Sequence, residues 1–137
     1  MKIVIINGPN LNLLGKREVD IYGGEPFESF FKKLQAGHPG IEISYFQSNV
    51  EGELINEIQR VGFSYDGIIF NPGGYTHTSV AIGDAIAAIT TPVIEVHISN
   101  IFGRADFRKI SHVSGKAKGV ISGLGLKGYE LALTWFT

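Results

Sequence analysis

Short apolar runs alternate with longer amphipathic stretches along most of the chain. Continuous β-branched runs are typical of strands that are buried on both faces of a parallel sheet. Strands are predicted at residues 3–6, 41–47, 68–70 and 93–98, with a fifth around residues 120–121. Apolar residues three and four apart predict helices that begin near residues 26, 51, 78 and 127.

The alternation of strand and helix predicts one α/β domain over residues 1–137, with a parallel sheet. Five strands in this length indicate a flavodoxin-like, doubly wound sheet with the strand order 2-1-3-4-5. Two local features complete the prediction. A long loop is expected from residue 7 to about residue 25, and residues 48–51 have the form of a capping box at the start of the second helix.

Amides, a hydroxyl and an imidazole follow three of the predicted strands. In doubly wound sheets, ligands bind beyond the carboxyl ends of the strands where the strand order reverses, which here is between the first and third strands. The loops at that edge comprise residues 7–10, 71–74 and 97–100. A single asparagine in a turn usually caps the backbone. The convergence of all three loops favours a binding or catalytic site instead.

Two pairs of side chains suggest proton transfer. Glu95 and His97 are two residues apart on a strand, so they share a face, and a carboxylate beside an imidazole orients it for acid–base work. The alternative is a surface pair at a strand end. Arg17 and Tyr22 lie in the first loop, where a cation near a phenol favours the phenolate. The alternative is a solvated arginine and a packed tyrosine.

The distribution of cations restricts the chemistry further. No Lys or Arg occurs between Arg60 and Arg104, so this part of the edge offers no lysine for a Schiff base or a phosphate-binding loop. Arg104 and Arg108 could bind an anionic or hydroxylated substrate, or they could cap a short helix.

Composition excludes several classes of protein. The chain has no cysteine, which excludes disulfides, thiolate nucleophiles and cysteine metal sites. Its formal net charge of −1 gives no support for a partner that is a nucleic acid or a membrane surface. No apolar run reaches the roughly 18 residues of a membrane span, and the N-terminal run is too short for a signal peptide, so we expect a cytoplasmic domain. The four histidines lack close ligand spacing, so no metal site is expected.

Two further segments need interpretation. Residues 123–128 match G-x-G-x-x-G, but only nine residues follow, so the acidic residue expected about 20 positions later cannot exist. We interpret this run as a turn with close packing. The predicted helix at residues 78–89 carries Asp84 as its only charge, which favours a subunit interface over a helix buried within the monomer.

Taken together, these motifs resemble those of the type II 3-dehydroquinate dehydratases. The first motif comprises residues 7–15 with Arg17 and residues 22–23. The second is residues 71–79, and the third is residues 95–100 with Arg104 and residues 107–108. Shorter matches at residues 47–49, 51–54 and 128–129 extend the resemblance over nearly the whole chain. It implies an enzyme of the shikimate pathway that removes water from 3-dehydroquinate, by anti elimination through an enolate, without metal or cofactor.

The resemblance also implies individual catalytic roles. Tyr22 is the base that takes the proton alpha to the ketone, and Arg17, on a lid loop, favours its phenolate. Asn10 holds a water that stabilises the enolate oxygen. His97 protonates the departing hydroxyl, and Glu95 orients His97.

Other residues are implied to bind the substrate. A set that contacts its carboxylate and hydroxyls is implied, with Ile98 acting through its backbone: Asn71, His77, Ile98, Ser99 and Arg108. Asp84 would reach the site of a neighbouring subunit, in a dodecamer built as a tetramer of trimers.

Two other classes of function remain open from the fold alone. A flavodoxin-like module could bind a mononucleotide or a flavin, although the chain lacks a phosphate-binding signature. An interaction protein could use the apolar helix at residues 78–89 as its binding surface.

Overall fold

The computed structural model describes residues 1–16 and 18–137. Within these residues, five parallel strands form one sheet with the order β2-β1-β3-β4-β5, as predicted. The strands are β1 (Lys2–Asn7), β2 (Glu42–Gln47), β3 (Gly67–Asn71), β4 (Val93–His97) and β5 (Gly119–Ser122). The α-helices are α1 (Val19–Tyr22), α2 (Phe27–Gly37), α3 (Glu51–Val61), α4 (Val80–Ala88) and α5 (Lys127–Phe136).

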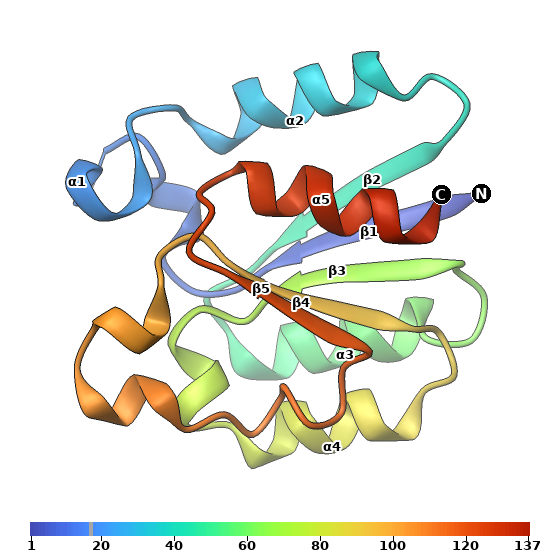
Figure 1. Ribbon diagram of the computed structural model, residues 1–137. Helices are drawn as coiled ribbons and strands as arrows, with labels where there is room; N and C mark the ends of the chain where they lie inside the picture. The colour runs from blue at the N-terminus through green and yellow to red at the C-terminus, as the bar shows by residue number, and fades with distance from the viewer. Residues whose placement is uncertain (17) are drawn as a thin grey trace.

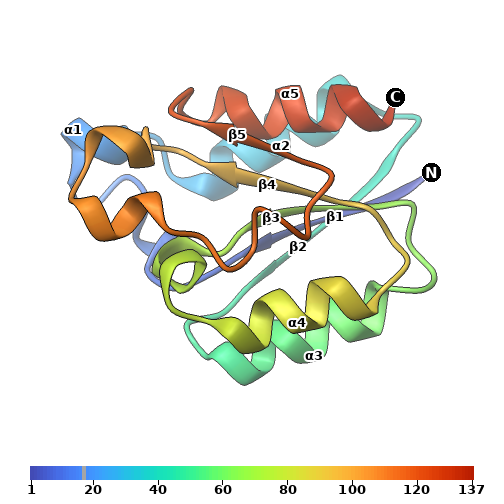
Figure 2. The same ribbon diagram turned by 60° about the horizontal axis from the view of Figure 1, so that its bottom comes forward.

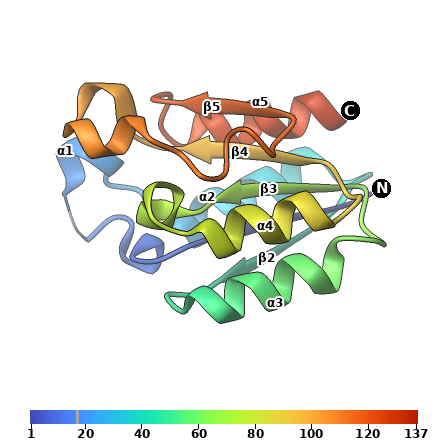
Figure 3. The same cartoon turned by 90° about the horizontal axis from the view of Figure 1, so that it is seen from below.

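Helices cover both faces of the sheet. Figure 1 shows α2 and α5 on one face and α3 and α4 on the other, and Figure 3 shows α3 and α4 in front of the strands. Alternate residues of β1 enter different cores: Ile3 and Ile5 join the core beneath α2 and α5, whereas Val4 and Ile6 join the core above α3 and α4. This alternation is the physical reason that β1 reads as a continuous apolar run.

The segment predicted as one long loop contains two short helices, so that prediction is wrong in part. A 3₁₀ helix, η1, spans Leu11–Leu13, and α1 forms a single turn at Val19–Tyr22. One turn is too short to show an apolar period, and α1 has no buried residue. Backbone hydrogen bonds close the turn, including Tyr22 N–H to the Glu18 carbonyl at 3.0 Å.

The predicted capping box is also wrong in its register. The N-cap of α3 is Val50, and it makes no side-chain cap. The Ser48 hydroxyl accepts the Val50 N–H at 2.9 Å and contacts Glu53 rather than Glu51. Ser48 therefore closes a turn before the helix, because the helix begins two residues later than the motif implies.

The G-x-G-x-x-G run forms a turn with close packing, as interpreted from the sequence. It leaves β5 through Gly123 and Gly125, both at positive φ, and then enters α5. The helix α4 packs Ile82, Ala85 and Ile86 inward and leaves Val80 and Asp84 exposed. The chain itself therefore covers only one face of α4, and a subunit interface over the other face stays a prediction.

The carboxyl ends of the strands form one edge of the molecule. Figure 2 shows α1 and the loop that follows β4 at this edge, with both termini at the other end. In the described residues, no helix is long and apolar enough to cross a membrane.

A close contact joins the loops that leave β1 and β3. Gly8 N–H donates to the Asn71 carbonyl at 2.7 Å, and a Cβ on Gly8 would lie 2.4 Å from the Pro72 carbonyl oxygen. Any larger residue at position 8 would push the two loops apart.

We therefore expect Gly8→Ala to lower the free energy of unfolding by about 1–3 kcal/mol, as overpacked sites do. Gly52 in α3 provides a matched control, because a Cβ there meets nothing within 4 Å. Gly52→Ala should raise stability by about 0.4–1 kcal/mol. Urea unfolding of both variants measures the difference, and equal stabilities would show that the loops do not depend on this contact.

Candidate active site

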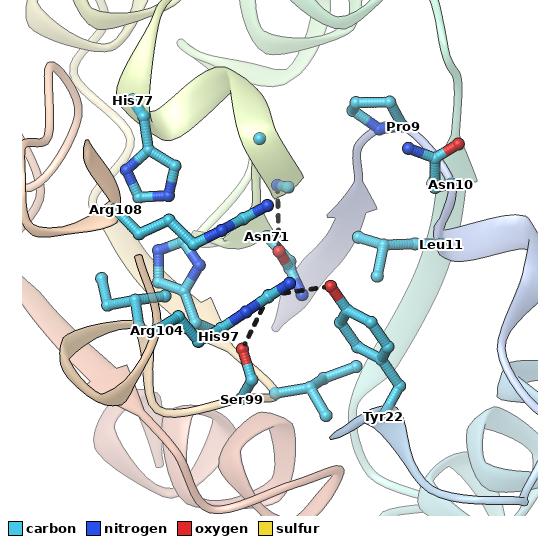
Figure 4. A pocket seen from close by; sticks show the side chains of 14 residues that line it. Pro9, Asn10, Leu11, Tyr22, Asn71, His77, His97, Ser99, Arg104 and Arg108 are labelled. Carbon is cyan, nitrogen blue, oxygen red and sulfur yellow. Dashed lines mark hydrogen bonds between the residues drawn. The ribbon is translucent and has the colours of Figure 1, made fainter. Parts of the chain in front are cut away.

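A polar cavity lies at the edge where the strand order reverses. Its volume is about 110 Å³. The loops after β1, β3 and β4 line it together with α1 and η4 (Asp106–Lys109), a 3₁₀ helix. Figure 4 shows Tyr22 entering from one wall and His77, His97 and Arg108 from others.

Glu95 and His97 form a buried pair on one face of β4. Glu95 is 0% exposed, and its Oε2 accepts a hydrogen bond from His97 Nε2. The same carboxylate accepts from Ser114 Oγ at 2.8 Å and from Thr76 Oγ1 at 3.3 Å. A buried carboxylate needs such partners. Because Nε2 of His97 is hydrogen-bonded to Glu95, Nδ1 is the ring nitrogen that can bond a molecule in the cavity.

Arg104 joins Tyr22 to Ser99. Its Nη1 donates to the Tyr22 hydroxyl oxygen at 2.9 Å and to Ser99 Oγ at 3.2 Å, as the dashed lines in Figure 4 mark. This contact places a cationic side chain directly at the Tyr22 hydroxyl. The sequence suggested Arg104 only as a substrate ligand or a cap, so this contact is a finding of the structure. Arg17, predicted to act on Tyr22, lies outside the described residues.

His77 lines the cavity as a neutral acceptor. Its Nδ1 lies 2.7 Å from the Ile110 carbonyl, which only accepts, so Nδ1 carries the proton. Nε2 is buried and has no hydrogen-bond partner among the residues that the structure describes. Burial lowers the pKa of His77 below its ordinary 6.5, and the nearby Arg108 and His97 lower it further. The His77 and His97 rings stand 6.4 Å apart between centroids.

The two asparagines at the cavity are held by their backbones and neighbours. Asn10 has a left-handed backbone (φ 70°), and its N–H donates to Asn49 Oδ1 at 2.9 Å. Asn71 Oδ1 accepts from Gly73 N–H at 3.1 Å, and its Nδ2 donates to the Tyr129 hydroxyl at 2.9 Å. The side-chain amide of Asn71 is therefore fixed at both its oxygen and its nitrogen, whereas the contact of Asn10 fixes its backbone.

The structure brings most of the predicted site residues to this one cavity. The set that lines it consists of Asn10, Tyr22, Asn71, His77, His97, Ile98, Ser99 and Arg108, with Glu95 directly behind His97. Asp84 does not line it and lies exposed on α4. Its predicted role in a neighbouring subunit stays a prediction.

Sequence reasoning missed several residues that support the site. Thr76 belongs to the second motif, so its proximity to Glu95 could have been suspected. Ser114 lies outside every motif and meets Glu95 only because the chain returns before β5. Among residues 1–16 and 18–137, no group of three His, Asp or Glu side chains could hold a metal ion.

Comparison with known proteins identifies, over residues 1–137, the same family that the sequence motifs resemble. The sequence model described as Dehydroquinase class II matches residues 1–137. A 3-dehydroquinate dehydratase of Campylobacter jejuni is 53% identical over 135 residues, covering 97% of this chain and 85% of that protein. One of Actinobacillus pleuropneumoniae is 53% identical over 134 residues, covering 96% and 87%.

A solved structure of a type II dehydroquinase is also similar to this chain. The type II dehydroquinase of Butyrivibrio crossotus superposes with a TM-score of 0.95 at 47% identity, covering 99% of this chain and 97% of that one. The fold is thus shared with that enzyme. The chain belongs to the type II dehydroquinase family.

Proposed function

We propose that this chain dehydrates 3-dehydroquinate to 3-dehydroshikimate, with Tyr22 as base and His97 as acid. One observation carries the proposal: a cation-paired tyrosine and a carboxylate-paired histidine line the same small polar cavity. Membership of the dehydroquinase family supports 3-dehydroquinate as the substrate and the shikimate pathway as the setting of the reaction.

The first step removes the proton alpha to the ketone. Tyr22 takes this proton as a phenolate, and the electrons of the broken C–H bond form an enolate. A free tyrosine is almost entirely protonated at neutral pH, so the phenolate needs a nearby positive charge. Arg104 supplies one at 2.9 Å. The resemblance adds Arg17 to this role and Asn10 as the holder of a water at the enolate oxygen.

The second step expels the hydroxyl beta to the ketone. The enolate electrons form the new carbon–carbon double bond, the C–O bond breaks, and His97 donates a proton so that water leaves. Glu95 fixes the imidazole and stabilises the imidazolium that donates this proton. Tyr22 comes from α1 and His97 from β4, and Figure 4 shows them entering from different walls, which supports anti elimination.

The remaining residues of the cavity bind the substrate. Arg108 extends into it in Figure 4 and offers a planar pair of donors for a carboxylate. His77 offers the unprotonated Nε2 as an acceptor for a hydroxyl. Ser99 and the backbone of Ile98 follow β4 at the same wall, and Asn71 faces them from β3.

The proposal includes a homo-oligomer, a dodecamer built as a tetramer of trimers in the cytoplasm. It is supported by the exposed apolar residues of α4, where Val80 is 58% exposed beside Ala81. Asp84 lies on the same helix and would reach a neighbouring site. The reaction transfers no electrons between molecules, so the mechanism calls for no redox cofactor, and its proton transfers use side chains alone.

The test is an absorbance assay for the conjugated enone product. The purified chain should convert 3-dehydroquinate with a chelator present and after borohydride treatment, because neither a metal nor an imine takes part. Tyr22→Phe should lose about 100-fold or more in kcat while folding normally, which is the range for loss of a general base.

Tyr65→Phe is the matched control, since Tyr65 lies under Lys2 and Arg60 on another part of the surface. It should keep the activity of the unmodified chain. No turnover by the unmodified chain would reject the proposed function, and a near-normal kcat in Tyr22→Phe would remove Tyr22 from the mechanism.

The neutral state of His77 gives a prediction for stability against pH. Its pKa is lower in the folded chain than its ordinary 6.5, so below about pH 6.5 the unfolded chain binds more protons. The free energy of unfolding should therefore fall as pH decreases from about 6.5 towards the folded pKa. His77→Asn keeps a donor for the Ile110 carbonyl and does not titrate, so its unfolding should depend less on pH in this window. Equal slopes in urea titrations at several pH values would contradict the assignment.

A further inference from the structure

The hydroxyl of Tyr129 lies buried between the ends of β1 and β3, and the proposed reaction does not use it. Tyr129 is 0% exposed and comes from the first turn of α5, far along the chain from both strands. Asn7 and Asn71 end these strands as register partners. The Tyr129 hydroxyl bonds both of their side chains, so it joins the two strands where the strand order reverses.

The hydrogen bonds that link Gly73, Asn71, Tyr129, Asn7 and Tyr45 form a chain in which each donor and each acceptor can be assigned. Gly73 N–H can only donate, so the Asn71 atom that it contacts is the carbonyl oxygen. Asn71 must then present its NH₂ group to Tyr129, at 2.9 Å. The single Tyr129 proton goes to Asn7 Oδ1 at 2.8 Å. Asn7 Nδ2 in turn donates to the Tyr45 hydroxyl at 3.3 Å.

This order determines which way the Asn71 amide faces. One Nδ2 proton is taken by Tyr129, and the second is left for the cavity that Asn71 lines. A flipped amide would set its NH₂ group against Gly73 N–H and lose that bond. Burial raises the pKa of Tyr129 well above its ordinary value, so the hydroxyl keeps its proton and the order does not change with pH.

Packing holds the Tyr129 ring in place independently of its hydroxyl. The ring meets Phe27 edge-on with centroids 5.1 Å apart. Gly128 lets α5 approach the sheet, because a Cβ there would lie 3.2 Å from Val96 and 3.4 Å from Ile121. The last glycine of the G-x-G-x-x-G run thus serves to set the depth of Tyr129.

We propose that Tyr129 is a positioning residue, which holds the Asn71 amide in the orientation that binds substrate. This inference rests on the proposed function, since it takes Asn71 as a substrate ligand. The Tyr129 hydroxyl touches no substrate and acts only through Asn71. It links α5 to the cavity through one bond.

The test compares Tyr129→Phe with Tyr45→Phe. The first keeps the ring and leaves the buried Nδ2 of Asn71 without its partner, so KM for 3-dehydroquinate should rise about tenfold with kcat changing much less. The second removes a hydroxyl that meets Asn7 but not Asn71, and KM should stay within about twofold. An unchanged KM in Tyr129→Phe, with only a lower Tm, would overturn the proposal and leave a structural role.

A double-mutant cycle tests whether Tyr129 affects KM through Asn71. In an Asn71→Ala background, Tyr129→Phe should cause no further rise in KM, because the group that it positions is gone. A rise of the same size in both backgrounds would overturn the proposal. If Tyr129→Phe does not fold, Asn7→Ala carries the same cycle, because it removes the acceptor of the Tyr129 proton.

A crystal structure of Tyr129→Phe separates this inference from the proposed function. It should show the Asn71 amide rotated or in two conformers, whether or not the chain dehydrates 3-dehydroquinate. An Asn71 amide in its original single orientation would overturn the positioning role. Absence of turnover by the unmodified chain would instead reject the proposed function.

Discussion

The parallel register of β1 and β3 is the constraint on which the cavity depends. It sets Asn7 beside Asn71 and brings Gly8 N–H to the Asn71 carbonyl, so the loops that leave the two strands touch. The chain continues from β1 to α2 and from β3 to α4, which lie on opposite faces of the sheet (Figure 1), and both loops line the cavity. Without glycine at position 8 the two backbones could not approach this closely. The site is therefore a direct result of how the sheet is wound.

The second requirement is the burial of a carboxylate in β4. Glu95 interrupts an apolar strand, and burying its charge costs stability unless partners compensate. His97, Thr76 and Ser114 together provide these partners, and one of them faces the cavity. The core therefore contains a buried carboxylate, and this carboxylate holds the His97 ring in one orientation. Such conflicts between core packing and polarity are expected at functional sites.

Much of the fold and of the site could be predicted from the sequence, because both depend on the spacing of apolar residues and on the order of the elements. The alternation of strands and helices predicted the parallel sheet. The two-residue spacing of Glu95 and His97 predicted that they share one face of a strand. The one-turn helix α1 could not be predicted, because a single turn has no period to detect. The contact of Arg104 with Tyr22 and that of Ser114 with Glu95 join segments far apart in the chain, so no local pattern reports them. Tyr129 was visible only in the short match to the family at residues 128–129, which indicated no role for its hydroxyl.

The central claim is that a base and an acid on different walls of the cavity remove a proton and a hydroxyl from opposite faces of the substrate. It is tested most directly with 3-dehydroquinate that carries deuterium on one face only of the carbon alpha to the ketone and next to the carbinol that loses its hydroxyl. Mass spectrometry of the product then reports which hydrogen left. The account predicts that deuterium opposite the departing hydroxyl is lost and that deuterium on the same face is retained. The reverse pattern would contradict it.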